Sequence, residues 1–70
     1  MDIIFTLHAE TQIKERGILK QEVIDSIKYP DNVNKKHSKY YYQKRLDRGA
    51  IEIVTERTEK HIKVITVYWL

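Results

Sequence analysis

The fourteen residues from Lys35 to Arg48 concentrate the side chains that could bind an anion. They include six cations, three tyrosines and a single acid, Asp47, whereas the rest of the chain holds seven bases and nine acids. The net charge of +3 therefore comes from this stretch alone. Because cations release counterions from phosphates and tyrosine rings stack on unpaired bases, the stretch is a candidate nucleic-acid surface. The alternative is a solvated edge strand, on which lysines prevent aggregation. The six cations are Lys35, Lys36, Lys39, Lys44, Arg45 and Arg48.

A second candidate group is a helical stripe formed by His8, Gln12 and Arg16, spaced four residues apart. The pKa of histidine, near 6.5, suits proton transfer close to neutrality, and arginine can hold a phosphate. At about 1.5 Å of rise per residue, His8 and Arg16 lie about 12 Å apart, so they cannot act on one atom. The alternative interpretation is that His8 forms a hydrogen bond within the core and Arg16 complements the helix end.

The strands offer further polar groups. Lys44 and Arg45 are candidate phosphate contacts, and Thr66 and Tyr68 alternate onto one face of the last predicted strand. Strands favour threonine and tyrosine whatever their function, so ordinary β-propensity is the alternative. Three widely spaced histidines, without cysteine or an acidic cluster, predict no metal site, and the sequence predicts no cofactor.

Two helices are expected in the first half of the chain. The first runs from Leu7 to Arg16, with Thr6 as its N-cap and Gly17 in the left-handed conformation that ends it. The second runs from about residue 19 or 20 to Lys28 and ends before Pro30, which disfavours helical geometry in the residue that precedes it.

Beyond Pro30 the apolar period changes from helical to alternating, which predicts strands over residues 38–46, 50–57 and 62–69. Residues 3–5 form either a short strand or an apolar lead-in. The expected fold is α+β: an N-terminal αα-hairpin packed on one face of a small antiparallel sheet of three or four strands, with 62–69 as its central strand. The other sheet face is expected to remain available for a ligand.

Length and composition predict one small domain spanning residues 1–70. A chain of 70 residues buries a modest core, so a partner, including a second copy in a homodimer, is a candidate source of added stability. The absence of cysteine fits a reducing cytoplasm. No apolar run approaches the roughly 20 residues that span a bilayer, and the start of the chain lacks the pattern of a signal peptide.

Several short motifs occur together along nearly the whole chain: Thr6-x-His8-Ala9, Glu15-Arg16-Gly17-Ile18, Val23, Pro30 and Val64-Ile65-Thr66-Val67-Tyr68. This combination resembles a widespread bacterial and archaeal family of small domains of unknown function. Its members read T-x-H-A-x-x-R-x-x-x-R-G-I near the start and V-I-T-V-Y at the end. The family is similar in layout to BrnT-like toxins and, more distantly, to RelE-like RNA endonucleases.

The resemblance implies a metal-independent fold that cleaves RNA, free or on the ribosome, and that is often paired with an antitoxin protein. The motif histidine falls on His8 and the second motif arginine on Arg16. Gln12 replaces the first motif arginine, which removes a charge from the helical stripe and bears on catalysis more than on binding.

The sequence and the resemblance together predict an RNA endonuclease in which His8, Arg45 and Tyr68 are catalytic. The alternative is a non-catalytic module that binds nucleic acid or protein on the same scaffold, and a third hypothesis is a regulator whose basic strand docks on an acidic protein. The expected RNA-binding residues are Arg16, Lys39, Tyr40, Tyr42, Lys44 and Thr66.

Overall fold

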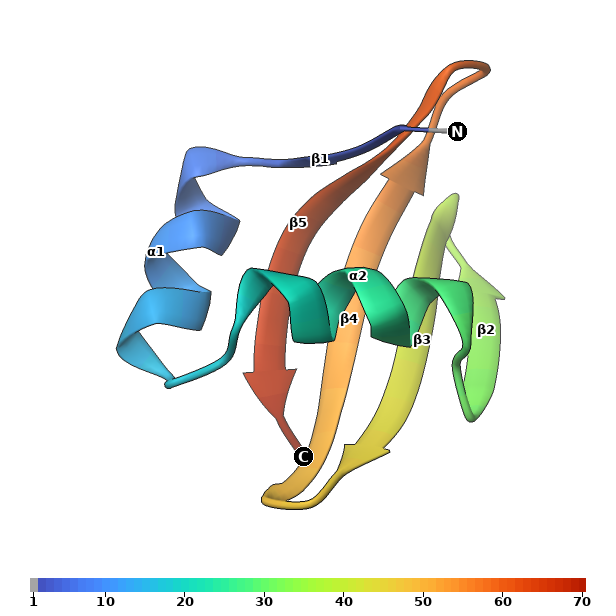
Figure 1. Ribbon diagram of the computed structural model, residues 1–70. Helices are drawn as coiled ribbons and strands as arrows, with labels where there is room; N and C mark the ends of the chain where they lie inside the picture. The colour runs from blue at the N-terminus through green and yellow to red at the C-terminus, as the bar shows by residue number, and fades with distance from the viewer. Residues whose placement is uncertain (1) are drawn as a thin grey trace.

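A computed structural model describes residues 2–70 as two short helices beside a five-stranded sheet (Figure 1). In chain order the elements are β1 (Asp2–Phe5), α1 (Leu7–Glu15), α2 (Lys20–Lys28), β2 (Asn32–Lys36), β3 (Lys39–Leu46), β4 (Gly49–Arg57) and β5 (His61–Trp69). The strand order is β1-β5-β4-β3-β2. No helix among these residues combines the length and apolar character needed to cross a bilayer.

The α+β class is confirmed, but the expected antiparallel sheet of three or four strands is wrong, because the sheet is mixed and has five strands. β1 pairs in parallel with the start of β5, with Asp2 opposite His61 and Phe5 opposite Val64. The other pairs are antiparallel. The centre of the sheet is therefore β4 and not β5, the strand expected there.

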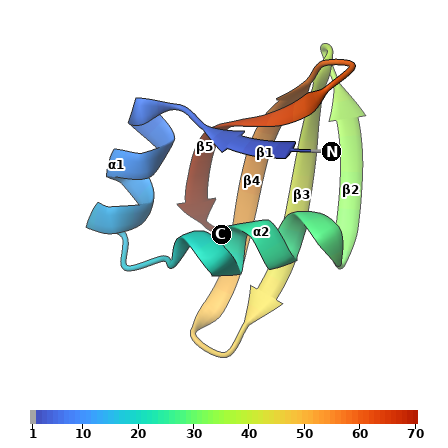
Figure 2. The same cartoon turned by 45° about the horizontal axis from the view of Figure 1, so that its top comes forward.

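The expected αα-hairpin is also wrong. α1 lies beside β5 while α2 crosses over β4 toward β3, so each helix packs on the sheet rather than along the other helix (Figures 1 and 2). The helix boundaries follow their local signals: the Thr6 hydroxyl accepts a hydrogen bond from Ala9 N at 3.0 Å, and Gly17 has a φ of 67°. The buried residues that join the helices to the sheet are Ala9, Ile13, Val23, Ile27, Tyr42, Ile51, Ile53, Val64 and Val67.

The strand that the sequence did not predict is β2, whose five residues are all exposed. It forms a hairpin with β3 through His37 and Ser38, which have φ values of 53° and 67°. Two consecutive positive φ values are the geometry of a type I′ turn, for which Asn-Gly is the usual sequence signal. Because neither residue is a glycine or an asparagine, this signal is missing from the sequence.

The outer edge of β5 is completed by side chains of α1 once β1 has ended. Gln12 Oε1 accepts hydrogen bonds from Val67 N at 3.0 Å and from the Thr66 hydroxyl at 2.7 Å. Arg16 Nη1 donates to Val67 O at 2.6 Å. These contacts satisfy backbone groups that a neighbouring strand would otherwise pair, and they hold α1 along the sheet edge.

We expect Gln12→Ala to lower the free energy of unfolding by about 1–3 kcal/mol, because Val67 N and the Thr66 hydroxyl lose their shared acceptor. Urea titration followed by circular dichroism measures this change. The matched control is Gln21→Ala on α2, where the exposed side chain bonds only to Asp25 within the same helix. Equal losses in the two variants would contradict the role given to Gln12.

Candidate nucleic-acid interface

The sheet face turned away from the helices, called the open face from here on, carries mostly polar side chains. Alternation along β3, β4 and β5 directs the core residues toward the helices and the intervening residues to the open face. Its cations outnumber its acids, Asp2, Glu52 and Glu56, by four to three. The four cations are Lys36, Lys39, Arg45 and Lys63.

A hydrogen-bonded row crosses four strands of the open face. Asn32 Nδ2 donates to Gln43 Oε1 at 3.4 Å, and Gln43 Nε2 donates to Glu52 Oε2 at 2.7 Å. The Tyr68 hydroxyl donates to the other carboxylate oxygen of Glu52. Glu52 is therefore fixed in orientation from both sides, near the middle of the face.

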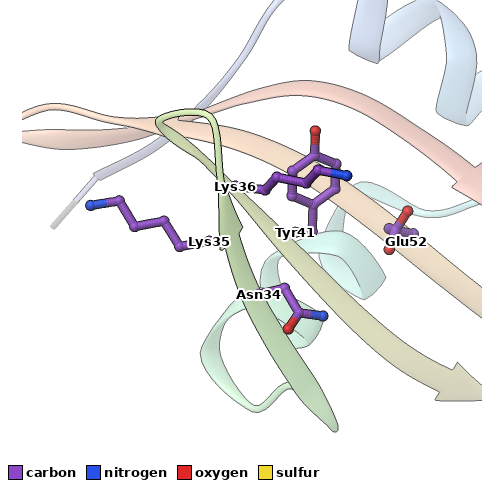
Figure 3. A pocket seen from close by; sticks show the side chains of 5 residues that line it. All are labelled: Asn34, Lys35, Lys36, Tyr41 and Glu52. Carbon is purple, nitrogen blue, oxygen red and sulfur yellow. The ribbon is translucent and has the colours of Figure 1, made fainter.

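A hollow of about 440 Å³ lies beside this row, between β2 and β4. It is lined by Asn34, Lys35, Lys36, Tyr41 and Glu52. Figure 3 shows the side chains of Lys36, Tyr41 and Glu52 on one side of β2 and the ammonium of Lys35 turned away from them. An aromatic ring, a cation, an amide and a carboxylate are the groups with which proteins recognise an unpaired nucleotide.

The cationic stretch identified in the sequence is divided between the two sides of the sheet. Lys36, Lys39 and Arg45 lie on the open face, where Arg45 is exposed. Lys44 points to the helix side and lies 3.4 Å from Asp31 Oδ1, while the backbone N of Arg45 donates to Asp31 Oδ2 at 2.8 Å. The hydrogen bond from the Arg45 amide, assisted by Lys44, lowers the pKa of Asp31 below its usual value.

Arg48 has a structural role in the turn between β3 and β4. Its Nη1 and Nη2 each donate to a different carboxylate oxygen of Glu22 at 2.8 Å, and Nη2 also donates to Gly17 O at 3.1 Å. The guanidinium lies 5.7 Å from the Trp69 ring centre. The hydrogen bond from Arg48, with another from the Leu19 amide, lowers the pKa of Glu22 from 4.5 to about 2.

The two tyrosines expected to stack on bases point toward the helices. Tyr42 is 2% exposed, and its hydroxyl accepts hydrogen bonds from Arg57 Nη2 at 2.6 Å and Nε at 3.2 Å, so it is not available to a base. The Tyr40 ring is half-buried, with Arg57 4.4 Å and Lys35 5.5 Å from its centre. Of the three consecutive tyrosines 40–42, the one on the open face is Tyr41.

The three residues expected to be catalytic do not meet at one point. His8 is exposed on α1, one turn before Gln12, and therefore lies near Thr66 at the edge of β5. Arg45 is two strands away and four residues further along the sheet, a separation of about 16 Å at ordinary strand geometry. The structure therefore does not bring His8 and Arg45 into contact.

The other residues that the sequence predicted for the site lie on the open face or at the β5 edge. Thr66 and Tyr68 do share the open face, where their hydroxyls bond to Gln12 and Glu52. Lys39 lies on the open face beside Glu56, whereas Arg16 bonds to the backbone of β5.

Sequence reasoning missed two of the residues that line the hollow, Asn34 and Glu52, whereas Lys35, Lys36 and Tyr41 belong to the candidate stretch 35–48. Glu52 lies between the buried residues Ile51 and Ile53, so alternation places its side chain on the sheet face away from the core. The same pattern is expected of any solvent-exposed acid on a strand, so it does not mark Glu52 as a site residue. Asn34 and Lys36 belong to β2, the strand without a sequence signal. Within residues 2–70 no three His, Asp or Glu side chains gather as metal ligands.

Two helices on one side of a mixed five-stranded sheet, with a polar and cationic opposite face, define a small α+β domain with one sheet surface open to a ligand. The chain belongs to the DUF4258 family, a domain of unknown function whose model matches residues 5–69. The expected membership in a family of small domains of unknown function is thereby confirmed, while the likeness to toxin ribonucleases stays a prediction. No curated protein and no solved structure matches the chain significantly.

The hydrogen bond from Arg48 keeps the Glu22 carboxylate ionised in the folded state at pH values where the same carboxyl is protonated in the unfolded chain. Because the folded pKa is lowered, this stabilisation is present above about pH 4.5 and is lost as the pH falls toward 2. In the wild-type protein the free energy of unfolding should decrease as the pH falls through this range. We expect a smaller decrease in Arg48→Ala, in which the lowered pKa of Asp31 still contributes. Denaturant titrations at several pH values test this, with Lys20→Ala as a control that removes an exposed ion pair. An unchanged acid profile in Arg48→Ala would contradict this assignment.

Proposed function

We propose that the protein binds single-stranded RNA on the open face. The observation that carries this proposal is the hollow in which the Tyr41 ring, Lys36, Asn34 and Glu52 come together on the face that the helices leave bare. A tyrosine ring stacks on an unpaired base, and an ammonium group contacts a phosphate.

The charge and chemistry of the surrounding face favour a nucleic acid. The open face carries four cations and three acids, and one of these acids, Glu52, already accepts hydrogen bonds from Gln43 and Tyr68. Side-chain amides at Asn32 and Asn34 can bond to base edges, which are accessible in a single strand but paired in a duplex. The bare face, the aromatic ring and the excess of cations therefore point to the same ligand.

We expect Tyr41→Ala to weaken binding of a single-stranded oligoribonucleotide by about 1–3 kcal/mol, the usual loss when one stacked base is released. Lys36→Gln should reduce the slope of log K against log salt by about 0.7. Fluorescence anisotropy at several salt concentrations measures both quantities.

The control for Tyr41 is Tyr29→Ala, which removes a tyrosine that is 71% exposed at the end of α2 and outside the open face. Equal affinity in the Tyr41 and Tyr29 variants would show that the hollow does not bind RNA.

Metal-independent cleavage of the bound RNA is a second candidate function, favoured by the fixed carboxylate of Glu52 in the hollow. In such a reaction a base takes the proton of the ribose 2′-hydroxyl, the 2′-oxygen bonds to phosphorus, and the bond to the 5′-oxygen breaks as that oxygen gains a proton. Lys36 would hold the phosphate charge beside Glu52, whereas His8 would exchange protons at the β5 edge.

We expect cleavage to be insensitive to a chelator and to fall by about 100- to 10,000-fold when the group that exchanges the proton is removed. Single-turnover rates of Glu52→Gln and His8→Ala, measured with RNA affinity and melting temperature, separate the two positions. A loss in Glu52→Gln assigns the chemistry to the hollow, and a loss in His8→Ala assigns it to the β5 edge. Unchanged rates in both variants would show that neither group exchanges the proton, and no cleavage by the wild-type protein would leave RNA binding as the function.

A further inference from the structure

A second cationic and aromatic cluster lies on the helix side of the sheet, beside β2. It consists of Lys35, Tyr40 and Arg57 and is called the β2-edge cluster from here on. The Arg57 guanidinium lies 4.4 Å and the Lys35 ammonium 5.5 Å from the centre of the Tyr40 ring. Three strands contribute to it, since Lys35 is in β2, Tyr40 in β3 and Arg57 in β4.

The positive charge of this cluster is not balanced by a carboxylate. Among residues 2–70 the ion pairs are Lys20–Glu10, Lys44–Asp31 and Arg48–Glu22, and none includes Lys35 or Arg57. The contacts of the two cations are to a tyrosine ring and a tyrosine hydroxyl, which are neutral. Two like charges around one ring repel each other, so a bound anion would stabilise the arrangement.

Arg57 is held in place before any ligand arrives. Its Nε and Nη2 both donate to the hydroxyl of buried Tyr42, at 3.2 Å and 2.6 Å, while its side chain is exposed. A guanidinium has five donor hydrogens, so these two contacts leave others for an incoming oxygen. A fixed arginine with unused donors is suited to a phosphate group.

The β2-edge cluster and the hollow are built from consecutive residues of the same two strands. Lys36 and Tyr41 line the hollow on the open face. Lys35 also borders the hollow, but its side chain is directed to the other side of the sheet, toward the Tyr40 ring. Figure 3 shows Lys35 and Lys36 leaving β2 in opposite directions. β2 is the last strand of the sheet, so only its exposed outer edge separates the two sites.

We propose that the β2-edge cluster is a phosphate-binding site for a single-stranded RNA that leaves the hollow and passes around the outer edge of β2. This inference rests on the proposed binding of RNA in the hollow and extends its path to the helix side. A flexible single strand can turn around one β-strand, whereas a duplex is stiff over about 150 base pairs and cannot. The ligand is therefore a single strand long enough to occupy both sites.

The test uses the full chain and single-stranded oligoribonucleotides of about four and about twelve nucleotides, lengths that span the usual sites for one small domain. We expect Lys35→Gln to weaken binding of the longer oligonucleotide by roughly threefold and to reduce its salt slope by about 0.7. Binding of the shorter oligonucleotide, which fills only the hollow, should be unchanged. The matched control is Lys14→Gln, which removes one exposed lysine from α1.

Arg57→Lys and Arg57→Gln give a second and independent measurement. Lysine keeps the charge and a donor for Tyr42, so its salt slope should stay close to the wild-type value. Glutamine keeps a donor but loses the charge, so the slope for the longer oligonucleotide should fall by about 0.7. Melting temperatures of both variants separate loss of the ligand contact from loss of the Tyr42 hydrogen bond.

The outcomes distinguish this inference from the proposed function. If Lys35→Gln behaves like Lys14→Gln while Lys36→Gln weakens both oligonucleotides, the β2-edge cluster does not bind RNA but the hollow does. Equal affinity for a duplex of the same length would also overturn the path around β2. If the wild-type protein binds neither oligonucleotide, the proposed function itself fails and the inference fails with it.

Discussion

The fold depends on which groups form hydrogen bonds with the backbone along the outer edge of β5. β1 pairs with only the first part of this strand, so from Ile65 onward no strand lies on the side of β5 away from β4. Gln12 and Arg16 replace it, one as an acceptor and one as a donor, and the Trp69 indole donates to Arg16 O at 2.9 Å. Together these contacts fix α1 along the sheet edge. The placement of both helices on one side of the sheet is consistent with that position.

Because α1 lies along the β5 edge and α2 crosses the core, both helices cover the same side of the sheet and neither covers the other side. The opposite side must then be stable in contact with water, and the polar row from Asn32 to Tyr68 meets this requirement without apolar cover. The cations also have different roles, since Arg48 joins α2 to the sheet while Lys36, at the hollow, forms no ion pair with the described residues. A site on this face therefore leaves the core unchanged, because no buried residue is needed to form it.

Sequence reasoning succeeded where structure is determined locally and failed where it depends on pairing between distant segments. Thr6, Gly17 and Pro30 mark the helix ends, and alternation defines β3 to β5, so these elements were predicted nearly at their observed bounds. No local sequence pattern predicts the parallel pairing of β1, because its partner lies 59 residues further along the chain.

β2 is almost wholly polar and is formed through a turn without glycine, so no apolar pattern indicates it. For the site, the sequence predicts the cations but not which face of the sheet the helices leave open. The separation of His8 from Arg45 depends on the register of three strands, which a single sequence does not contain.

The pairing of the first strand with the last sets the order in which the chain can reach its native state. β2, β3 and β4 are joined by short turns, and hairpins of this kind form within about 1–10 μs. β1 has no partner until residues 61–64 are present, so during synthesis the earliest strand must wait for nearly the entire domain to be made. Closing so long a loop has an entropic cost that only the completed sheet offsets, which makes this contact a late step in folding. A ribosome-bound chain that stops before β5 therefore lacks the strand to which both β1 and α1 attach.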